Sequence, residues 1–235
     1  MNIVECRDVT KTYQQGKVTV HALNGVSLDI TQGGFTALYG PSGSGKTTLL
    51  NLIGGLDRPD SGMVRVNGDE LGAMSQTKLA HMRLTKVGFI FQSYNLIPVL
   101  TALENVEFVM QLQGAPESER RPKARAILDE VGLEGMHNRK PSELSGGQQQ
   151  RVAVARAIVA DPVIVLADEP TANLDSKTGQ GLLDMMQHLN QAKGVTFIFS
   201  THDHMVMEYS RRLVRLKDGR VEADEVRETA AEVPA

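Results

Sequence analysis

Two segments of the chain, far apart in sequence, have the residue types of phosphate-binding loops. Leu144–Arg151 places a serine and two glycines directly before a run of helix formers. Such an arrangement makes a helix N-terminus, whose free N–H groups attract an anion. Gly40–Thr47 matches the phosphate-loop pattern G-x-x-x-x-G-K-[ST] in full. Two such segments argue against a simple one-site NTPase, and they allow the first to contact nucleotide that another subunit holds.

The Gly40–Thr47 segment is well supported, because a predicted strand precedes it and a predicted helix follows it. Its glycines let the backbone wrap around phosphate groups without Cβ clashes. Lys46 is expected to reach the β- and γ-phosphates and to act in catalysis, and the Thr47 hydroxyl is expected to ligate Mg²⁺. A glycine-rich turn with a surface lysine is the disfavoured alternative. The residues predicted to bind nucleotide here are Gly40, Pro41, Ser42, Gly43, Ser44, Gly45, Lys46, Thr47 and Thr48.

The apolar stretch Val163–Ala167 ends in two acidic residues, Asp168 and Glu169. In a parallel α/β sheet, ligand sites lie outside the carboxyl ends of the strands. Asp168 is then placed to hold Mg²⁺, directly or through water. Glu169 points elsewhere, because successive side chains of a strand alternate, and it is the best candidate for the general base that polarises an attacking water. The alternative is an acidic strand exit without a catalytic role.

Three further residues are weaker candidates for the same site. His202 follows the apolar run Val195–Phe199 and is expected to hydrogen-bond the γ-phosphate and the attacking water. Gln92 follows the run Val87–Phe91, and its amide oxygen is suited to contact Mg²⁺ or the water. Tyr13 is expected in a short N-terminal loop, where its ring would stack on adenine. Taken alone, each residue also fits a structural or solvated role.

The elements that must position these residues follow from the hydrophobic pattern. The alternating stretches Ile3–Val9 and Val26–Ile30 predict half-buried strands, and the unbroken runs Val163–Ala167 and Val195–Phe199 predict central parallel strands. From Leu103 to Ala160 the pattern is mainly helical. Other expected elements are strands at Phe35–Tyr39, Met63–Val66 and Val87–Phe91, a helix at Lys46–Leu56 and a hairpin turn at Lys217–Arg220.

The chain has 235 residues, of which 41% are hydrophobic and 23% are charged. This composition is that of an ordinary globular protein. The net charge of −3 gives no electrostatic footprint for nucleic acid, and the single cysteine, Cys6, excludes an internal disulfide. The N-terminus does not look like a signal peptide, and no apolar run approaches the about 20 residues that span a bilayer. We therefore expect a cytoplasmic protein, with one domain over residues 1–222, a helical subdomain over about 94–160 inserted in it, and a disordered acidic tail over 223–235.

Taken together and in this order, the motifs resemble the nucleotide-binding subunit of ABC transporters, from about Ile3 to Val221. The resemblance implies an α/β fold: a P-loop NTPase (RecA-like) core with a mainly parallel sheet, an N-terminal antiparallel β subdomain and an α-helical subdomain. It also implies an ATPase that uses ATP and Mg²⁺, the metal being held by Thr47, Gln92 and Asp168. The motif roles are Tyr13 as the A-loop aromatic, Gly40–Thr47 as Walker A, Gln92 as the Q-loop glutamine, Leu144–Gln148 as the signature, Asp168 as the end of Walker B, Glu169 as the catalytic carboxylate, Asp175 as the D-loop aspartate and His202 as the switch histidine.

The family arrangement implies a homodimer in which two copies meet head to tail. Each ATP would lie between the Walker A loop of one copy and the signature of the other. Ser145 and Gly147 would then touch the γ-phosphate across the interface, with Gly146, Gln148 and Asp175 also at the ATP. This arrangement accounts for two phosphate-binding segments in one chain.

Within the family, several stretches resemble the branch of lipoprotein-release, macrolide-export and division-linked subunits (the LolD, MacB and FtsE type). The stretches are Leu49–Asp57, Phe91–Pro98, Leu100–Val106 and Leu166–Asp175. The resemblance implies an integral-membrane permease subunit that contacts Gln92–Val109, and a place on the inner face of the bacterial cell membrane through that partner. Gly34 and Ala172 depart from the residues common at their positions, although neither change removes a catalytic group.

Other functions remain open at this point. The chain lacks the long coiled-coil insertion of DNA-repair relatives and the tandem ATPase units of ribosome-acting relatives, which disfavours a soluble non-transport ABC ATPase. The Asn95–Val106 stretch and the short C-terminus argue, by resemblance, against an importer subunit for small solutes. A kinase-like phosphotransferase leaves the signature without a role. The cargo stays undetermined, because the surface that faces it would belong to the partner.

Overall fold

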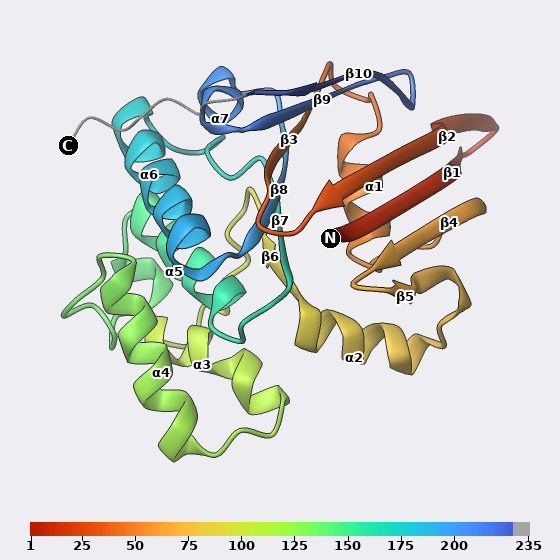
Figure 1. The fold of residues 1–235 in the computed structure, drawn as a ribbon. Coiled ribbons are helices and arrows are strands. Elements are labelled where there is room, and N and C mark those ends of the chain that lie inside the picture. The colour runs from red at the N-terminus through yellow and green to blue at the C-terminus, as the bar shows by residue number, and fades with distance from the viewer. Residues whose placement is uncertain (228–235) are drawn as a thin grey trace.

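The computed structural model describes residues 1–227, which form two β-sheets and the helices packed around them (Figure 1). The smaller sheet is antiparallel, with strand order β2-β1-β4-β5. Its strands are β1 (Asn2–Gln15), β2 (Val18–Thr31), β4 (Ser61–Val66) and β5 (Asp69–Glu70). This sheet is the antiparallel N-terminal part that the sequence predicted.

The larger sheet has the strand order β10-β9-β3-β8-β7-β6 and is parallel from β9 to β6. Its strands are β3 (Phe35–Tyr39), β6 (Val87–Ile90), β7 (Ile164–Asp168), β8 (Thr196–Thr201), β9 (Arg212–Lys217) and β10 (Arg220–Val226). Only β10 runs antiparallel, because the predicted turn joins it directly to β9. The mainly parallel core sheet is therefore confirmed, and its carboxyl ends meet at one edge.

Helices cover both faces of the larger sheet, as Figure 1 shows. They are α1 (Lys46–Ile53), α2 (Gln76–Lys86), α3 (Ala102–Leu112), α4 (Glu117–Glu130), α5 (Gly146–Ile158), α6 (Ser176–Lys193) and α7 (His204–Tyr209), with short 3₁₀ turns at Leu71–Ala73 and Pro141–Glu143. Alternate residues of β7 divide between the two cores: Ile164 and Leu166 pack with the N-terminal sheet, α1 and α2, whereas Val165 and Ala167 pack with α3 to α6. Burial on both faces explains why these strands read as unbroken apolar runs.

Local sequence signals explain where the helices begin and end. A capping box of Thr101 and Glu104 starts α3, Asp175 caps α6 through the backbone N–H of Thr178, and α6 ends at Gly194, whose φ is 66°. Helix α1 ends at Ile53 rather than at the predicted Leu56, because Gly54 and Gly55 follow directly. Among residues 1–227, no helix combines the length and the apolar content that crossing a membrane requires.

Two features differ from the sequence expectations. Tyr13 lies within β1 and not in a loop, because β1 and β2 extend far beyond their alternating cores and pair up to Gln15 and Val18. Strand β10 reaches Val226, so residues 223–226 of the expected disordered tail are strand. Cross-strand partners on β9 hold this polar segment, including a bidentate contact from Arg212 to Asp224 at 2.7 and 2.8 Å. The expected tail from residue 228 onward lies outside the described residues.

Candidate functional site

The loop between β3 and α1 carries the predicted phosphate-binding residues. Its glycines are required by close backbone neighbours as well as by their dihedral angles. A Cβ atom on Gly40 (φ 144°) would lie 2.1 Å from the carbonyl oxygen of Leu216, and one on Gly45 (φ 102°) would lie 2.5 Å from that of Ala22. Both positions therefore exclude every side chain, and the loop is fixed against the strands β9 and β2.

Lys46 is folded back onto this loop. Its amino group donates hydrogen bonds to the carbonyl oxygens of Gly40 and Pro41, at 2.9 and 3.0 Å. Burial lowers the pKa of Lys46, and the carboxylates of Glu169 and Asp168 oppose that shift. Beside it, the buried hydroxyl oxygen of Ser44 has no hydrogen-bond partner within residues 1–227. A phosphate group in this loop would supply that missing partner and accept hydrogen bonds from Lys46.

Thr47 and Asp168 meet at the carboxyl edge of the sheet, with the Thr47 hydroxyl 3.0 Å from a carboxylate oxygen of Asp168. Hydroxyl and carboxylate oxygens are suitable ligands for Mg²⁺, which commonly takes one or two protein ligands and completes its shell with phosphates and water. No cluster of three or more His, Cys, Asp or Glu side chains suited to a metal occurs within residues 1–227. The donor set of Thr47 and Asp168 thus fits a metal that arrives with a nucleotide.

Glu169 is held in a left-handed conformation at the end of β7, with φ 46°. Its N–H donates to the carbonyl oxygen of Ser200 at 2.9 Å, which ties it to the end of β8. One carboxylate oxygen accepts from the Thr201 hydroxyl at 3.3 Å, and the other lies 2.7 Å from Nδ1 of His202. The Glu169 side chain is 17% exposed and that of His202 is 73% exposed. A carboxylate fixed at both oxygens beside an accessible imidazole can orient and deprotonate a water.

Most of the predicted residues line one cavity of about 550 Å³. It is bounded by Tyr13, Val20, Ala22, Ser42, Gly43, Ser44, Gly45, Lys46, Thr47, Thr48, Gln92, Glu169 and His202. The Tyr13 hydroxyl donates to Asp57 at 2.8 Å, and the ammonium of Lys11 lies 5.2 Å from the ring centroid. Burial raises the pKa of Tyr13, and the hydrogen bond to Asp57 adds to the rise. Tyr13 is therefore a fixed wall of the cavity, at its β1 side.

The signature residues Ser145 to Gln148 do not line this cavity. They start α5 through a reciprocal capping box, in which Ser145 Oγ accepts from the Gln148 N–H at 3.3 Å and the Ser145 N–H donates to Gln148 Oε1 at 2.9 Å. A Cβ on Gly146 would lie 2.8 Å from the hydroxyl oxygen of Tyr94, and one on Gly147 would lie 2.3 Å from Cγ2 of Thr178. A side chain at either position would thus require Tyr94 or Thr178 to shift.

Asp175 also lies outside the cavity, at the start of α6. It accepts hydrogen bonds from the hydroxyl and the N–H of Thr178, at 2.6 and 3.0 Å, and these bonds lower the pKa of Asp175. Because Thr178 also touches Gly147, the N-termini of α5 and α6 lie next to each other. Two helix N-termini at one place form a region of positive potential, and its residues do not line the cavity of the chain's own phosphate loop.

Sequence reasoning missed the contacts that connect these groups. The Thr171 hydroxyl donates to Asp203 at 2.6 Å, the Asp203 N–H donates to the Thr201 hydroxyl at 2.9 Å, and the amide of Asn173 donates to the carbonyl oxygen of Gln92 at 2.8 Å. They tie the segments that follow β6, β7 and β8 to each other. Ordinary polar residues in loops give no periodic or motif signal, so nothing in the sequence could have singled out these pairs.

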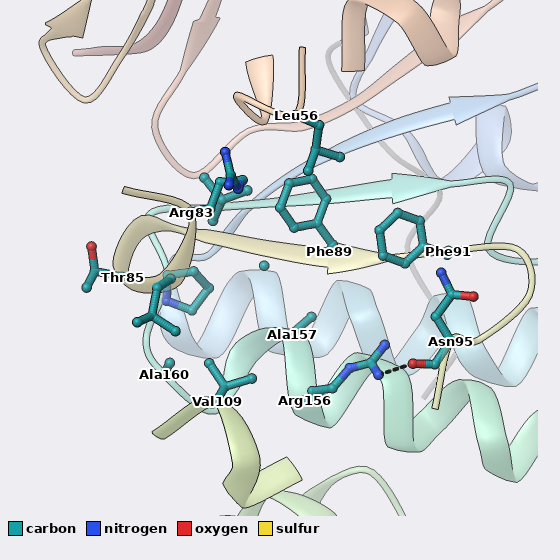
Figure 2. Close-up of a pocket in the computed structure, with 14 residues that line it drawn as sticks. Leu56, Arg83, Thr85, Phe89, Phe91, Asn95, Val109, Arg156, Ala157 and Ala160 are labelled. Atoms are coloured by element: carbon teal, nitrogen blue, oxygen red, sulfur yellow. Dashed lines mark hydrogen bonds between the residues drawn. The ribbon is translucent and has the colours of Figure 1, made fainter. Parts of the chain in front are cut away.

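A second cavity, of about 400 Å³, lies beside β6 (Figure 2). Its walls include Phe89 and Phe91, whose rings stack with centroids 5.7 Å apart, and Arg156 from α5. Of the predicted partner-binding range Gln92–Val109, Asn95 and Val109 line it. The remaining lining residues are Leu56, Arg83, Leu84, Thr85, Val87, Gly88, Ala157, Ala160 and Pro162. Most of this cavity therefore comes from outside the predicted range, on α2, β6 and α5.

Other apolar residues of the predicted range have different surroundings. Val99 is 72% exposed, and Leu96 packs against the core around α3 to α6. Asn105 is buried and binds the segment before α3, accepting from the Ile97 N–H at 2.7 Å and donating to the Leu100 carbonyl oxygen at 3.1 Å. Part of the range Gln92–Val109 therefore packs into the chain's own core.

Comparison with known proteins places this geometry in a family. A family profile described as "ABC transporter" matches residues 23–172. The lipoprotein-releasing system ATP-binding protein LolD of Geobacter metallireducens is 44% identical, over 95% of this chain and 99% of that protein. The macrolide export ATP-binding/permease protein MacB of Syntrophobacter fumaroxidans is 45% identical over 95% of this chain, but the match covers only 32% of that longer protein.

Among solved structures, the ATP-binding cassette MJ0796 of Methanocaldococcus jannaschii has a similar fold, with a TM-score of 0.87 and 45% identity. The match covers 95% of this chain and 98% of that one, whose structure is a dimer in a post-hydrolysis state bound to ADP and Pi. The sequence motifs, the P-loop fold and these matches agree. The chain belongs to the ABC transporter family, as an ATP-hydrolysing nucleotide-binding subunit of the LolD/MacB type.

Proposed function

We propose that two copies of this chain bind two ATP molecules between them, head to tail, and that closure of this dimer drives a membrane partner. The main observation behind this proposal is that the two phosphate-binding segments lie apart within one chain. The signature residues do not line the cavity that holds Lys46, Glu169 and His202. Within a single chain the signature and the cavity are not joined into one site. A head-to-tail pairing would bring the signature of one copy to the cavity of the other. The dimeric structure of MJ0796 supports this proposal.

In the proposed site, Lys46 leaves the carbonyl oxygens of Gly40 and Pro41 and binds the β- and γ-phosphates. Thr47, Asp168 and Gln92 are the residues that would hold Mg²⁺, which neutralises charge on the phosphate oxygens when bound. Ser145 and Gly147 at the positive N-terminus of α5 would contact the γ-phosphate of the facing copy. Asp175 and Tyr13 would complete the ATP contacts, at the dimer interface and at the adenine.

Hydrolysis in this proposal depends on Glu169 as general base. Its fixed carboxylate accepts a proton from the attacking water, while His202 hydrogen-bonds the water and the γ-phosphate. Once the γ-phosphate is released, the signature of the facing copy loses its ligand and the dimer opens. The difference in affinity of the closed dimer for ATP and for ADP is then the source of mechanical work.

We further propose that dimer closure moves an integral-membrane permease subunit. This partner holds the chain at the cytoplasmic face of the membrane. The names of the LolD and MacB relatives support a partner for lipoprotein release or macrolide export, so that export, extraction or mechanotransmission is the proposed process. The second cavity beside β6 is the proposed docking place, since it joins the predicted range Gln92–Val109 to an apolar wall of Phe89 and Phe91 (Figure 2).

Two measurements test the site: the rate of ATP turnover, and size-exclusion chromatography with and without ATP. Glu169→Gln should lower turnover about 100-fold or more, because a lost general base costs that much, and should trap an ATP-bound dimer. Adding Lys46→Ala should abolish both nucleotide binding and the trapped dimer. Glu134→Gln, an exposed carboxylate outside the cavity, is the matched control and should behave like the unmodified chain. Fast turnover of Glu169→Gln without a dimer would contradict the assigned base.

A further inference from the structure

Two charged side chains hold Tyr13 from outside the cavity that contains the phosphate loop. Asp57, which follows α1, accepts a hydrogen bond from the Tyr13 hydroxyl at 2.8 Å. The Lys11 ammonium donates to the other carboxylate oxygen of Asp57 at 2.9 Å and lies over the Tyr13 ring, 5.2 Å from its centroid. Tyr13 lines the cavity, whereas Lys11 and Asp57 do not. The ring is thus held at its hydroxyl end and on one face, and its other face remains for a ligand.

The hydrogen bond between Tyr13 and Asp57 joins a neutral donor to a charged acceptor. Burial acts to raise the pKa of Asp57, but hydrogen bonds from Lys11, from the Arg58 N–H and from Tyr13 outweigh it and leave this pKa below its usual value. Burial raises the pKa of Tyr13, and the bond to Asp57 adds to the rise. At neutral pH a protonated hydroxyl therefore faces an ionised carboxylate. Such bonds are stronger than those between neutral groups, so this one fixes the direction of the ring firmly.

The segment that carries Asp57 is itself fastened to β1. The Asp60 N–H donates to the carbonyl oxygen of Thr10 at 2.9 Å, and the Asp60 carboxylate accepts from the Thr12 N–H at 2.7 Å. Lys11 also donates to the carbonyl oxygen of Arg58, at 2.7 Å. These bonds join the segment after α1 to consecutive residues of β1, so the carboxylate that meets the ring has a fixed place.

Helix α1 connects this place to the phosphate loop. The helix starts at Lys46 and Thr47, the last residues of the loop. Beyond its end the chain turns tightly toward Asp57, with the Leu56 N–H donating to the carbonyl oxygen of Asn51 at 2.9 Å. Because a helix has a fixed rise of about 1.5 Å per residue, α1 sets the separation between the phosphate loop at one end and Asp57 at the other.

We propose that Asp57 is a positioning residue for the nucleotide. It holds the Tyr13 ring at the distance from the phosphate loop at which a purine base stacks on the ring while its phosphates occupy Gly40–Thr47. Lys11 supports the opposite face of the ring. Without Asp57 the ring would rotate about its side-chain bonds, and a bound nucleotide would have to immobilise it. This inference rests on the proposed ATP site and adds the group that aligns its base-binding part.

Calorimetric titration with two ligands, each with Mg²⁺, tests this role. ADP carries the base, whereas inorganic tripolyphosphate can occupy only the phosphate loop. Asp57→Ala should raise the Kd for ADP about fivefold, the cost of immobilising one side chain, and should leave the Kd for tripolyphosphate unchanged. Asp29→Ala is the matched control, since it removes a carboxylate that binds Arg7 on the same strand β1 at 2.6 Å. It should change neither Kd.

Variants of Tyr13 test the route through its hydroxyl. Tyr13→Phe keeps the ring and should raise the Kd for ADP about as much as Asp57→Ala does. Tyr13→Ala removes the stacking surface and should raise it about tenfold or more. Because Asp57→Ala and Tyr13→Phe break the same bond, the double variant should bind ADP no more weakly than Asp57→Ala alone.

The outcomes separate this inference from the proposed function. Unchanged ADP binding by Asp57→Ala, equal losses for both ligands, or additive losses in the double variant would overturn the role of Asp57 while the ATP site stands. If Asp57→Ala did not fold, Tyr13→Phe alone would decide, and an unchanged Kd for ADP would overturn the role. An unmodified chain that binds neither ligand would overturn the proposed site, and this inference with it.

Discussion

At the scale of single residues, the position of Glu169 is determined by its neighbours on β8. Its backbone adopts φ 46°, which costs a residue with a side chain on the order of 1 kcal/mol. The N–H bond to Ser200 and the Thr201 hydroxyl compensate for this cost and fix one carboxylate oxygen, so that the other faces His202. Thr201 in turn accepts from the N–H of Asp203. The hydroxyl of Thr201 therefore has a positioning role for the carboxylate.

Thr201→Val should lower kcat about tenfold and leave KM for ATP unchanged, because the hydroxyl orients the proposed base, Glu169, and does not line the cavity proposed to bind ATP. Steady-state ATPase assays measure both constants. Thr201→Ser restores the hydroxyl and should recover most of kcat. Thr196→Val is the matched control: it removes a buried hydroxyl from the other end of β8, where the Thr196 oxygen accepts from the Gly33 N–H at 2.9 Å. Thr196→Val should lower the free energy of unfolding but leave kcat unchanged. An equal loss of kcat in both valine variants would refute the positioning role of Thr201.

At the scale of elements, the contact between the starts of α5 and α6 gives Gly147 a structural reason to be glycine. A side chain there would meet Cγ2 of Thr178, while the Thr178 hydroxyl holds Asp175 at the start of α6. The two helix N-termini are thus set against each other by one glycine and one threonine methyl group. The spacing of the signature from the D-loop within one copy follows from this contact.

Gly147→Ala should lower the free energy of unfolding by about 1–3 kcal/mol, the usual cost of overpacking. Thr178→Ser removes the methyl group and keeps the hydroxyl that binds Asp175, so the double variant should recover most of this stability. Urea unfolding of the two single variants and the double variant measures the coupling. The ATPase activity of the double variant then shows whether Gly147 is needed only for packing or also for contact with nucleotide. If Thr178→Ser gave no recovery, the packing explanation for Gly147 would be wrong.

At the scale of the whole molecule, the most important feature is that the two phosphate-binding segments of one chain do not share a cavity. One chain holds the phosphate loop, Glu169 and His202 around one cavity, whereas the residues at the N-termini of α5 and α6 do not line it. In a head-to-tail dimer each complete site would take its halves from different copies. Variants that damage different halves should then complement each other, which variants in a one-chain site cannot do.

Lys46→Ala removes the phosphate-loop half and Ser145→Arg blocks the signature half. Each alone should hydrolyse no ATP and, in the Glu169→Gln background, should stay monomeric with ATP. When the two are mixed, a mixed dimer has one site with both changes and one site with neither, so ATP-dependent dimers should reappear on a sizing column. Mixing two preparations of the same variant is the control. A mixture that stays monomeric would contradict the shared site.

The sequence by itself determined the family, the parallel core and the phosphate loop, because these depend on local features. Glycine spacing around Lys46, apolar runs such as Val163–Ala167 and a capping serine at position 145 act through the residues next to them in the chain. The helix α2 and the strand extension that holds Tyr13 left weaker local signals, since their burial comes from packing against distant strands.

Only the tertiary structure decided which residues meet across the chain. Thr201 and Asp203 become partners of Glu169 and Thr171 because β7 and β8 are parallel neighbours whose carboxyl ends coincide. Arg156 reaches the turn at Tyr94, 62 residues earlier in the sequence, because α5 packs across β6. The side-chain types at these positions are unremarkable by themselves. Their roles arise from proximity, which depends on how the whole chain closes its two cores and which no local pattern encodes.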